Sequence, residues 1–152
     1  MTLRDYEPRD FETLFEIDRA AFAPDLAYSR AELRFYVRAP RCRTLVAEEE
    51  GEIVGFAIGC LERAGSGHVV TLDVRPGHQR QGIGGRLLRA IEERLHGMGA
   101  SAFCLETPVE EGGARGFYEK HGYRMQRRER GYYNGRRDAW RMVKRPPPGA
   151  PE

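Results

Sequence analysis

Four stretches of the chain carry apolar residues at the spacing that lets a helix bury one face. They begin at Asp10, Arg30, Ile83 and Ala114. Pro24 marks the end of the first stretch, and Ser29 with Glu32 forms a capping box before the second, which stops ahead of Pro40. Glycines follow the third and fourth stretches, as they commonly do where a helix ends. The pattern therefore predicts four helices.

Shorter apolar runs, separated by glycine, proline or clustered charges, predict seven strands. They cover residues 3–6, 44–48, 53–60, 68–74, 101–107, 123–129 and 139–144. The second and third runs are separated by residues 49–52 and the last two by a turn around residues 132–135, so both pairs are expected to form hairpins. Strands and helices alternate irregularly along the chain, which predicts an α+β protein with one mixed sheet covered by helices.

The chain length of 152 residues, with 40% apolar and 32% charged residues, suits one globular domain. We expect this domain to span residues 1–145 and the proline-rich residues 146–152 to form a disordered tail. No apolar run is long enough to cross a bilayer, and the first residues lack a signal-peptide core, so a cytoplasmic protein with no membrane partner is predicted.

Charge and cysteine content exclude several classes of function. A net charge of +2 gives no reason to expect nucleic-acid binding, and the arginines near the C-terminal hairpin are interleaved with acids as on a solvated face. Cys42, Cys60 and Cys104 are odd in number and include no CxxC pair. Reduced thiols are therefore expected rather than a disulfide framework or a zinc site, and the scattered histidines give no reason to predict a metal.

The segment from Val74 to Gly85 joins a predicted strand directly to the longest predicted helix. The first turn of a helix leaves backbone amides unpaired, and glycines allow a diphosphate to approach them, while Arg80 can add a charged contact. A Walker A loop is excluded because Ile83 follows Gly82 where lysine is required, and the glycine spacing does not fit a dinucleotide fingerprint. A tight turn that needs glycine only for packing remains the alternative.

Residues 79–84 read Gln-Arg-Gln-Gly-Ile-Gly, which matches the Q/R-x-x-G-x-G/A motif of the GNAT acetyltransferase superfamily. Three later blocks, residues 105–107, 114–123 and 131–142, resemble RimI-type enzymes, which acetylate the alanine amino group of a ribosomal protein. The resemblance covers most of the chain after Val69. It implies an α/β sandwich with a splayed mixed sheet of about seven strands, flanked by about four helices, and acetyl-CoA between the diverging fourth and fifth strands.

The resemblance also implies which residues contact acetyl-CoA. These are Leu72, Asp73, Val74, Gln79, Arg80, Gln81, Gly82, Ile83, Gly84 and Gly85. One position departs from the RimI pattern, because Glu111 stands where those enzymes usually have a cofactor-binding asparagine. An ionised carboxylate cannot donate the hydrogen bond of an amide, so a different contact or a different acceptor is expected here.

Acetyl transfer to an amine needs a base for the ammonium and benefits from an acid for the leaving thiolate. By the resemblance, Glu106 is the base and Tyr118 the acid. Taken alone, Glu106 also fits a solvated strand end and Tyr118 also fits a core aromatic. Tyr132 and Tyr133 are expected to line the acceptor groove opposite residues 23–28, with an exposed hairpin tip as the alternative.

We therefore predict an N-acetyltransferase that moves the acetyl group of acetyl-CoA to a primary amine by direct attack in a ternary complex. A protein or peptide N-terminal α-amine is the first choice of acceptor, and the protein is expected to be a monomer or homodimer. Acetylation of a small amine, such as a polyamine, amino acid or aminoglycoside, is the alternative, and a non-catalytic acyl-CoA-binding module is a third. A cysteine relay through Cys104 is less favoured, because nothing nearby in the sequence activates a thiol.

Overall fold

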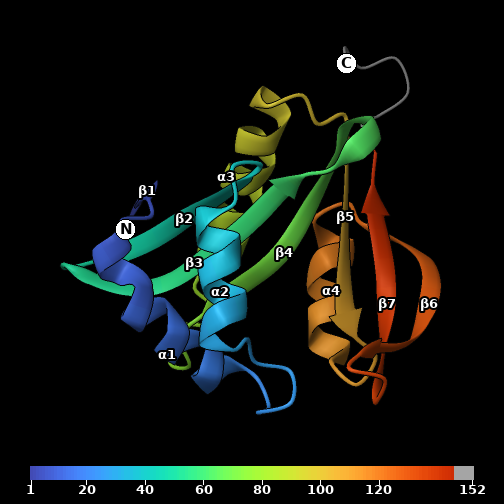
Figure 1. Cartoon of the computed structure of the whole chain (residues 1–152), viewed down its shortest axis with the longest axis horizontal. Helices are drawn as coiled ribbons and strands as arrows, with labels where there is room; N and C mark the ends of the chain where they lie inside the picture. The colour runs from blue at the N-terminus through green and yellow to red at the C-terminus, as the bar shows by residue number, and fades with distance from the viewer. Residues whose placement is uncertain (146–152) are drawn as a thin grey trace.

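The computed structural model describes residues 1–145, so the expected tail at residues 146–152 lies outside the described residues. Seven strands form one sheet in the order β1-β2-β3-β4-β5-β7-β6, with helices on both of its faces (Figure 1). The strands are β1 Thr2–Asp5, β2 Cys42–Glu49, β3 Glu52–Leu61, β4 Ser66–Val74, β5 Ala102–Pro108, β6 Arg124–Tyr133 and β7 Arg137–Lys144. The helices are α1 Phe11–Ala21, α2 Arg30–Arg38, α3 Ile83–Gly97 and α4 Gly112–Lys120.

The predicted α+β class, the seven strands and the four helices are all confirmed, with differences at some element ends. Helix α1 ends at Ala21, before the predicted stop at Pro24. Strand β4 begins at Ser66, within a predicted turn, because its first residues pair with β5. Strand β6 continues to Tyr133 through Gly131, whose φ of +61° allows the pairing with β7 to shift register there.

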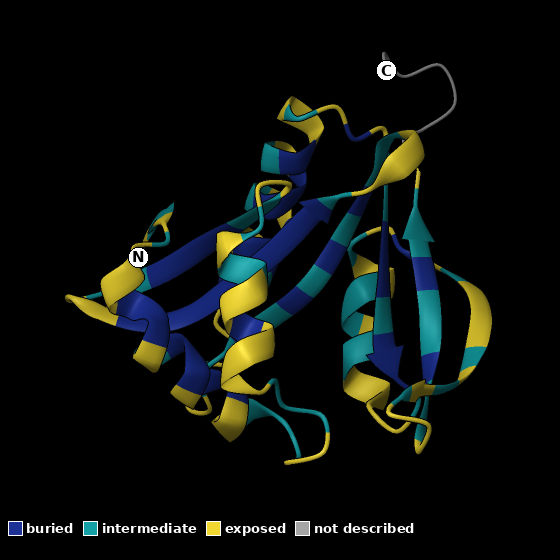
Figure 2. Ribbon diagram, in the orientation of Figure 1, coloured by how far each residue is buried: buried dark blue, intermediate teal, exposed yellow. Residues whose placement is uncertain are grey.

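Two apolar clusters lie on opposite faces of the sheet. Successive side chains of a strand point to opposite faces, so β2 directs Leu45 and Ala47 toward α3 and Val46 toward α1 and α2. The α3 face is buried under Leu87, Leu88, Ile91 and Leu95. Figure 2 shows the result, with the central strands buried and the outer surfaces of α1 and α2 exposed.

Close packing of α3 on the sheet depends on a glycine in β3. A Cβ added at Gly59 would lie 2.7 Å from Leu95 Cδ1 and 2.8 Å from Ile91 Cγ1. These distances are too short for carbon atoms in contact, so even alanine would push α3 away from the sheet. Gly59 therefore sets the depth at which α3 lies on the sheet.

Strands β4 and β5 separate in the middle of the sheet. They run parallel but pair only between Ser66–His68 and Ala102–Cys104. Beyond these residues the two strands diverge, as Figure 1 shows, toward their ends at Val74 and Pro108. The splayed sheet inferred from the family resemblance is thus confirmed, and the gap opens beside the residues expected to bind the cofactor and the acceptor.

The expectation of three reduced thiols is wrong for two of the cysteines. Cys42 and Cys60 form a disulfide and lie directly opposite each other in the register of β2 and β3. Cys104 is free and buried. The pair was missed because its closeness follows from the hairpin register, whereas the short cysteine motifs that can be recognised in a sequence reflect local spacing. Within residues 1–145, no helix is both long and apolar enough to span a bilayer.

Candidate active site

A cavity of about 490 Å³ opens where β4 and β5 diverge. Glu106 from β5, Tyr118 from α4 and Leu72 from β4 line it, together with Tyr132 and Tyr133 from β6. The connection between α1 and α2 supplies the opposite wall, including Phe22, Leu26 and Tyr28. Five residues singled out from the sequence, drawn from four different elements, therefore face one space.

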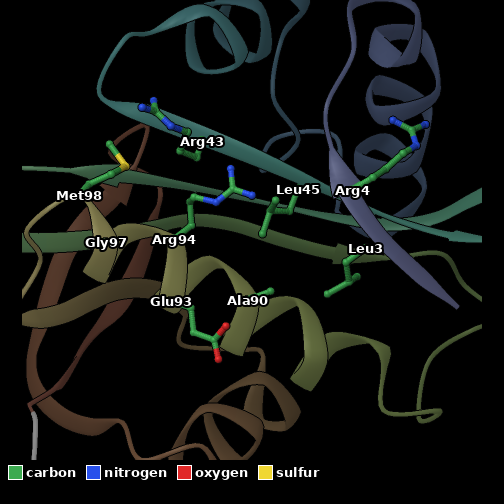
Figure 3. A pocket seen from close by; sticks show the side chains of 9 residues that line it. All are labelled: Leu3, Arg4, Arg43, Leu45, Ala90, Glu93, Arg94, Gly97 and Met98. Carbon is green, nitrogen blue, oxygen red and sulfur yellow. The ribbon is translucent and has the colours of Figure 1, made fainter.

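A second cavity, of about 460 Å³, lies between β1, β2 and the C-terminal half of α3 (Figure 3). Its floor is apolar, with Leu3, Leu45 and Met98. Two arginines at its rim are paired with acids, Arg4 with Asp10 and Glu48, and Arg94 with Asp5. None of the residues expected to act in catalysis lines this cavity.

Glu106 is held by three donors. Its Oε1 accepts hydrogen bonds from His68 Nε2 at 2.6 Å and from the Tyr132 hydroxyl at 3.1 Å, and its Oε2 accepts one from an Arg141 guanidinium nitrogen at 2.6 Å. The Glu106 side chain is 6% exposed. These three hydrogen bonds fix the orientation of the Glu106 carboxylate. Because the donors belong to β4, β6 and β7, its position depends on those strands as well as on β5.

The charges around Glu106 favour its ionised form. Burial raises the pKa of the Glu106 carboxyl, but the hydrogen bond and charge of His68, with Arg141 and Tyr132, outweigh burial and hold that pKa below its ordinary value. The pKa of His68 changes in the opposite direction. Burial lowers it, but Glu106 and Glu62 outweigh burial and raise it above its ordinary value. At neutral pH, Glu106 is therefore a carboxylate.

Tyr118 lies on α4 with its ring among aromatic neighbours. Its ring meets those of Phe117 and Tyr123 edge to face, at centroid distances of 5.2 and 5.8 Å. Loss of contact with water raises the pKa of the Tyr118 phenol, and the nearby Asp73 raises it further. The Tyr118 hydroxyl therefore keeps its proton well into the alkaline range. The sequence left two roles open for Tyr118, a core aromatic or the catalytic acid. Its position is compatible with both, because the ring packs against the core and the residue also lines the cavity.

The sequence left two explanations for the glycines before α3, phosphate binding and close packing, and different glycines of this segment fit each one. A Cβ at Gly85 would lie 3.0 Å from Cε1 of His121, the residue that follows α4, so Gly85 serves close packing, whereas a Cβ at Gly84 would make only an ordinary contact with Phe117 Cζ at 3.4 Å. Gly82 differs, because it caps α3 with a φ of +81° and has open space around the position of a Cβ. The first amides of α3 have no partner within the helix, an arrangement that suits an anionic group. The local structure therefore fits an acyl-CoA carrier.

Asp73 faces away from this loop. Its side chain is 1% exposed and lies beside Asp18 of α1, and Thr71 Oγ1 donates a hydrogen bond to it at 2.8 Å. Any contact of Asp73 with a cofactor in the cavity would involve its backbone. Gln79 bridges the loop instead, since its Nε2 donates to the Val74 carbonyl at 3.3 Å.

Two residues beside Glu106 were not identified from the sequence. His68 was one of four histidines without ligand spacing, and Arg141 was grouped with arginines on a solvated hairpin face. The strand register explains both, because Arg141 is the direct partner of Glu106 between β5 and β7, and His68 stands where β4 still pairs with β5. Among the described residues, no cluster of three His, Cys, Asp or Glu side chains is arranged to hold a metal ion.

Residues 10–123 of the chain match the sequence profile of the acetyltransferase (GNAT) family. The match covers most of the chain and includes the diverging strands and the loop before α3. The protein belongs to the GNAT acetyltransferase family, whose members use acetyl-CoA. The enzyme class predicted from the sequence, an acyl-CoA-dependent N-acetyltransferase, is confirmed.

Individual relatives agree with this assignment. An uncharacterized N-acetyltransferase of Methanocaldococcus jannaschii is 32% identical over 97% of this chain and 93% of its own. The ribosomal-protein-S18-alanine N-acetyltransferase of Escherichia coli has the same fold, with a TM-score of 0.84 at 24% identity over 99% of both chains. Naa20 of Chaetomium thermophilum, solved with a bisubstrate analogue, has a TM-score of 0.77 at 24% identity over 95% of this chain and 86% of its own. The likeness to RimI-type structures inferred from the sequence is thus confirmed at the level of the fold.

Proposed function

We propose that the protein transfers the acetyl group of acetyl-CoA to a primary amine, and that the preferred acceptor is a protein or peptide N-terminal α-amine. The observation that carries this proposal is that an ionised carboxylate, Glu106, and a protonated phenol, Tyr118, line one cavity at the point where β4 and β5 diverge. A base and an acid are the two groups that direct amine acetylation requires.

The residues have distinct roles in this proposal. When bound, acetyl-CoA supplies a thioester whose carbonyl carbon is open to attack; the head of α3, with Gly82 and Arg80, holds its diphosphate. Glu106 accepts a proton from the acceptor ammonium, directly or through a water, which frees the nitrogen lone pair to form the C–N bond. Tyr118 donates its proton to the sulfur as the C–S bond breaks, and the extra proton on the nitrogen passes to the Tyr118 phenolate as the amide forms. Glu106 then releases the first proton to solvent.

The charge of the cavity supports an amine as acceptor. Its described lining includes the carboxylates of Asp18, Asp25, Glu32, Glu106 and Glu111 and contains no lysine or arginine. The chain as a whole carries a net charge of +2, so this acidity is local. Arg141 and Arg137 pair with Glu106 and Asp25 from beside the cavity, which leaves the charges of Asp18, Glu32 and Glu111 without an arginine partner among the described residues. These three carboxylates favour a cationic acceptor over an anionic one.

The choice of an N-terminal amine has a different basis. The E. coli relative in fold is named for acetylating an alanine of a ribosomal protein, and Naa20 was solved with a bisubstrate analogue. In our chain the acceptor wall consists of a loop and a hairpin tip. We therefore place peptide N-termini ahead of polyamines, amino acids and aminoglycosides.

Acetyl-CoA consumption measured against a panel of N-terminal peptides and small amines tests the proposal. We expect turnover with at least one peptide and a higher kcat/KM for peptides than for small amines. A preference for small amines would shift the assignment to the alternative acceptor class. Calorimetric binding of coenzyme A without turnover of any amine would instead indicate a binding module.

A further inference from the structure

Two segments from distant parts of the chain meet beside the acceptor cavity. Arg137 at the start of β7 binds Asp25 through two hydrogen bonds, Nε to Oδ2 at 2.7 Å and a terminal nitrogen to Oδ1 at 3.2 Å. Asn134 Nδ2 donates to the Asp25 carbonyl at 3.4 Å. Asp25 and Asn134 both line the cavity. The contact therefore joins two segments that line the cavity.

The two segments joined by this contact are each anchored separately. We call residues 22–29, between α1 and α2, the acceptor loop. We call residues 131–137, which comprise the end of β6, the turn and the first residue of β7, the acceptor hairpin. The acceptor loop is fixed at Tyr28, whose amide donates to Asp18 Oδ2 at 2.7 Å and whose hydroxyl donates to the Val70 carbonyl at 3.1 Å. The acceptor hairpin is fixed at Gly131, whose amide donates to Asp138 Oδ1 at 2.8 Å.

Within residues 1–145, every hydrogen bond or ion pair between the acceptor loop and the acceptor hairpin involves Asp25. The side chains of Asp25 and Arg137 are 37% and 33% exposed. Ion pairs with this exposure contribute little net stability and are screened by salt. The contact is therefore specific in geometry but easily broken, unlike the more buried pair between Glu106 and Arg141.

We propose that Asp25 and Arg137 form a latch across the mouth of the acceptor cavity, and that this latch limits the size of the acceptor. With the latch closed, a slender chain end passes beneath the contact to Glu106. A bulky first residue enters only when the contact opens and the acceptor loop and acceptor hairpin move apart. This inference rests on the proposed function, since it concerns the acceptor of the same reaction.

The experiment compares two peptides that differ only in the first residue, alanine or tryptophan, in the wild type and in Arg137→Gln. We expect the variant to raise the ratio of kcat/KM for the tryptophan peptide over that for the alanine peptide by about three- to tenfold. The charge swap Asp25→Arg with Arg137→Asp restores the pair and should return the ratio toward that of the wild type. If Arg137→Gln acted only by disturbing the fold, the charge swap would not return the peptide ratio toward the wild-type value.

A matched control is available on another surface. Arg94 pairs with Asp5 at 2.7 Å, and the Arg94 side chain is 40% exposed, close to the value for Arg137. Arg94→Gln removes an equivalent ion pair away from the acceptor cavity and should leave the peptide ratio unchanged. Raising the ionic strength should shift the ratio in the wild type and in Arg94→Gln, but much less in Arg137→Gln.

A readout without turnover separates the two proposals. Arg137→Gln should increase amide hydrogen exchange in the acceptor loop and the acceptor hairpin together, whereas Arg94→Gln should not. An unchanged peptide ratio in an active Arg137→Gln variant would overturn the latch and leave the proposed function standing. A wild type that acetylates no amine, even though Arg137→Gln loosens both segments, would overturn the proposed function and with it the role of the latch in acceptor choice.

Discussion

At the scale of single residues, the position of Glu106 is decided by its neighbours on other strands. Arg141 lies opposite it in the register of β7, and His68 reaches it from the last paired residues of β4. These contacts keep the carboxylate ionised in a cavity that would otherwise favour its neutral form. The same contacts make the chemistry of Glu106 sensitive to changes in residues that do not themselves meet an acceptor.

Replacing the proposed base should reduce turnover without affecting cofactor binding. We expect Glu106→Gln to lower kcat by about 10²- to 10⁴-fold, the usual contribution of a positioned general base, and to leave the KM for acetyl-CoA close to that of the wild type. Steady-state kinetics with a peptide acceptor measure both constants. Glu16→Gln, on the exposed face of α1, is the matched control and should have no effect. Wild-type kcat in Glu106→Gln would exclude Glu106 as the base.

The coupling of His68 to Glu106 can be measured directly. In the wild type, the two carboxylates outweigh burial and raise the pKa of His68 above its ordinary value of 6.5. In Glu106→Gln the main carboxylate is gone while burial remains, so we expect the pKa of His68 to fall markedly, toward or below 6.5. NMR titration of the imidazole nitrogens of His68 gives this pKa. An unchanged His68 pKa would show that the two groups are not coupled.

At the scale of elements, a buried pair of acids joins α1 to β4. Asp18 and Asp73 lie next to each other, and each is 1% exposed. Oδ2 of Asp18 accepts a hydrogen bond from the Tyr28 amide. Burial, followed by the neighbouring Asp18, raises the pKa of Asp73 well above its ordinary value. Asp73 therefore binds its proton more tightly than an ordinary aspartate, at a point where β4 packs against α1.

This link predicts a particular pH dependence of stability. The folded state binds the Asp73 proton more tightly than the unfolded chain, whose aspartate pKa is near 3.9. The resulting stabilisation is complete below about pH 4 and is lost as pH rises toward the folded pKa. We expect Asp73→Asn to reduce this loss, so that its Tm falls less than that of the wild type between pH 5 and 8. Thermal unfolding across this range measures the difference. Asp5→Asn, an exposed control, should follow the wild type; parallel curves for Asp73→Asn would contradict the assignment.

Elements whose signals are local could be predicted from the sequence, and features that depend on strand register could not. The capping box at Ser29 and Glu32 forms at the start of α2 as expected, and the glycine pattern before α3 identified the family. The disulfide and the contacts of His68 and Arg141 depend on which residues of neighbouring strands lie opposite each other. A shift by one residue would place each of these side chains on the other face of the sheet. The orientation of Asp73 toward α1 was missed for the same reason.

At the scale of the whole molecule, the disulfide ties the end of β3 to the start of β2, just after α2. It closes a loop of 18 residues, for which chain entropy suggests about 3 kcal/mol of stabilisation. We expect a dithiol reductant to lower the Tm of the wild type and of Cys104→Ser, but to have no effect on Cys42→Ser. Thiol counting in denaturant without reductant should find one free thiol per chain. Three free thiols would show that the disulfide does not form.

The divergence of β4 and β5 has a consequence for solubility. A sheet that opens in its middle has four strand edges, and such edges usually invite pairing with other chains and aggregation. Here the two inner edges face each other within one molecule, walled by helices and by the segments around the cavity. Side chains already cover part of the β4 edge, since the Val70 carbonyl accepts the Tyr28 hydroxyl and the Val74 carbonyl accepts Gln79 Nε2. An edge covered in this way is a poor template for the strand of a neighbouring copy.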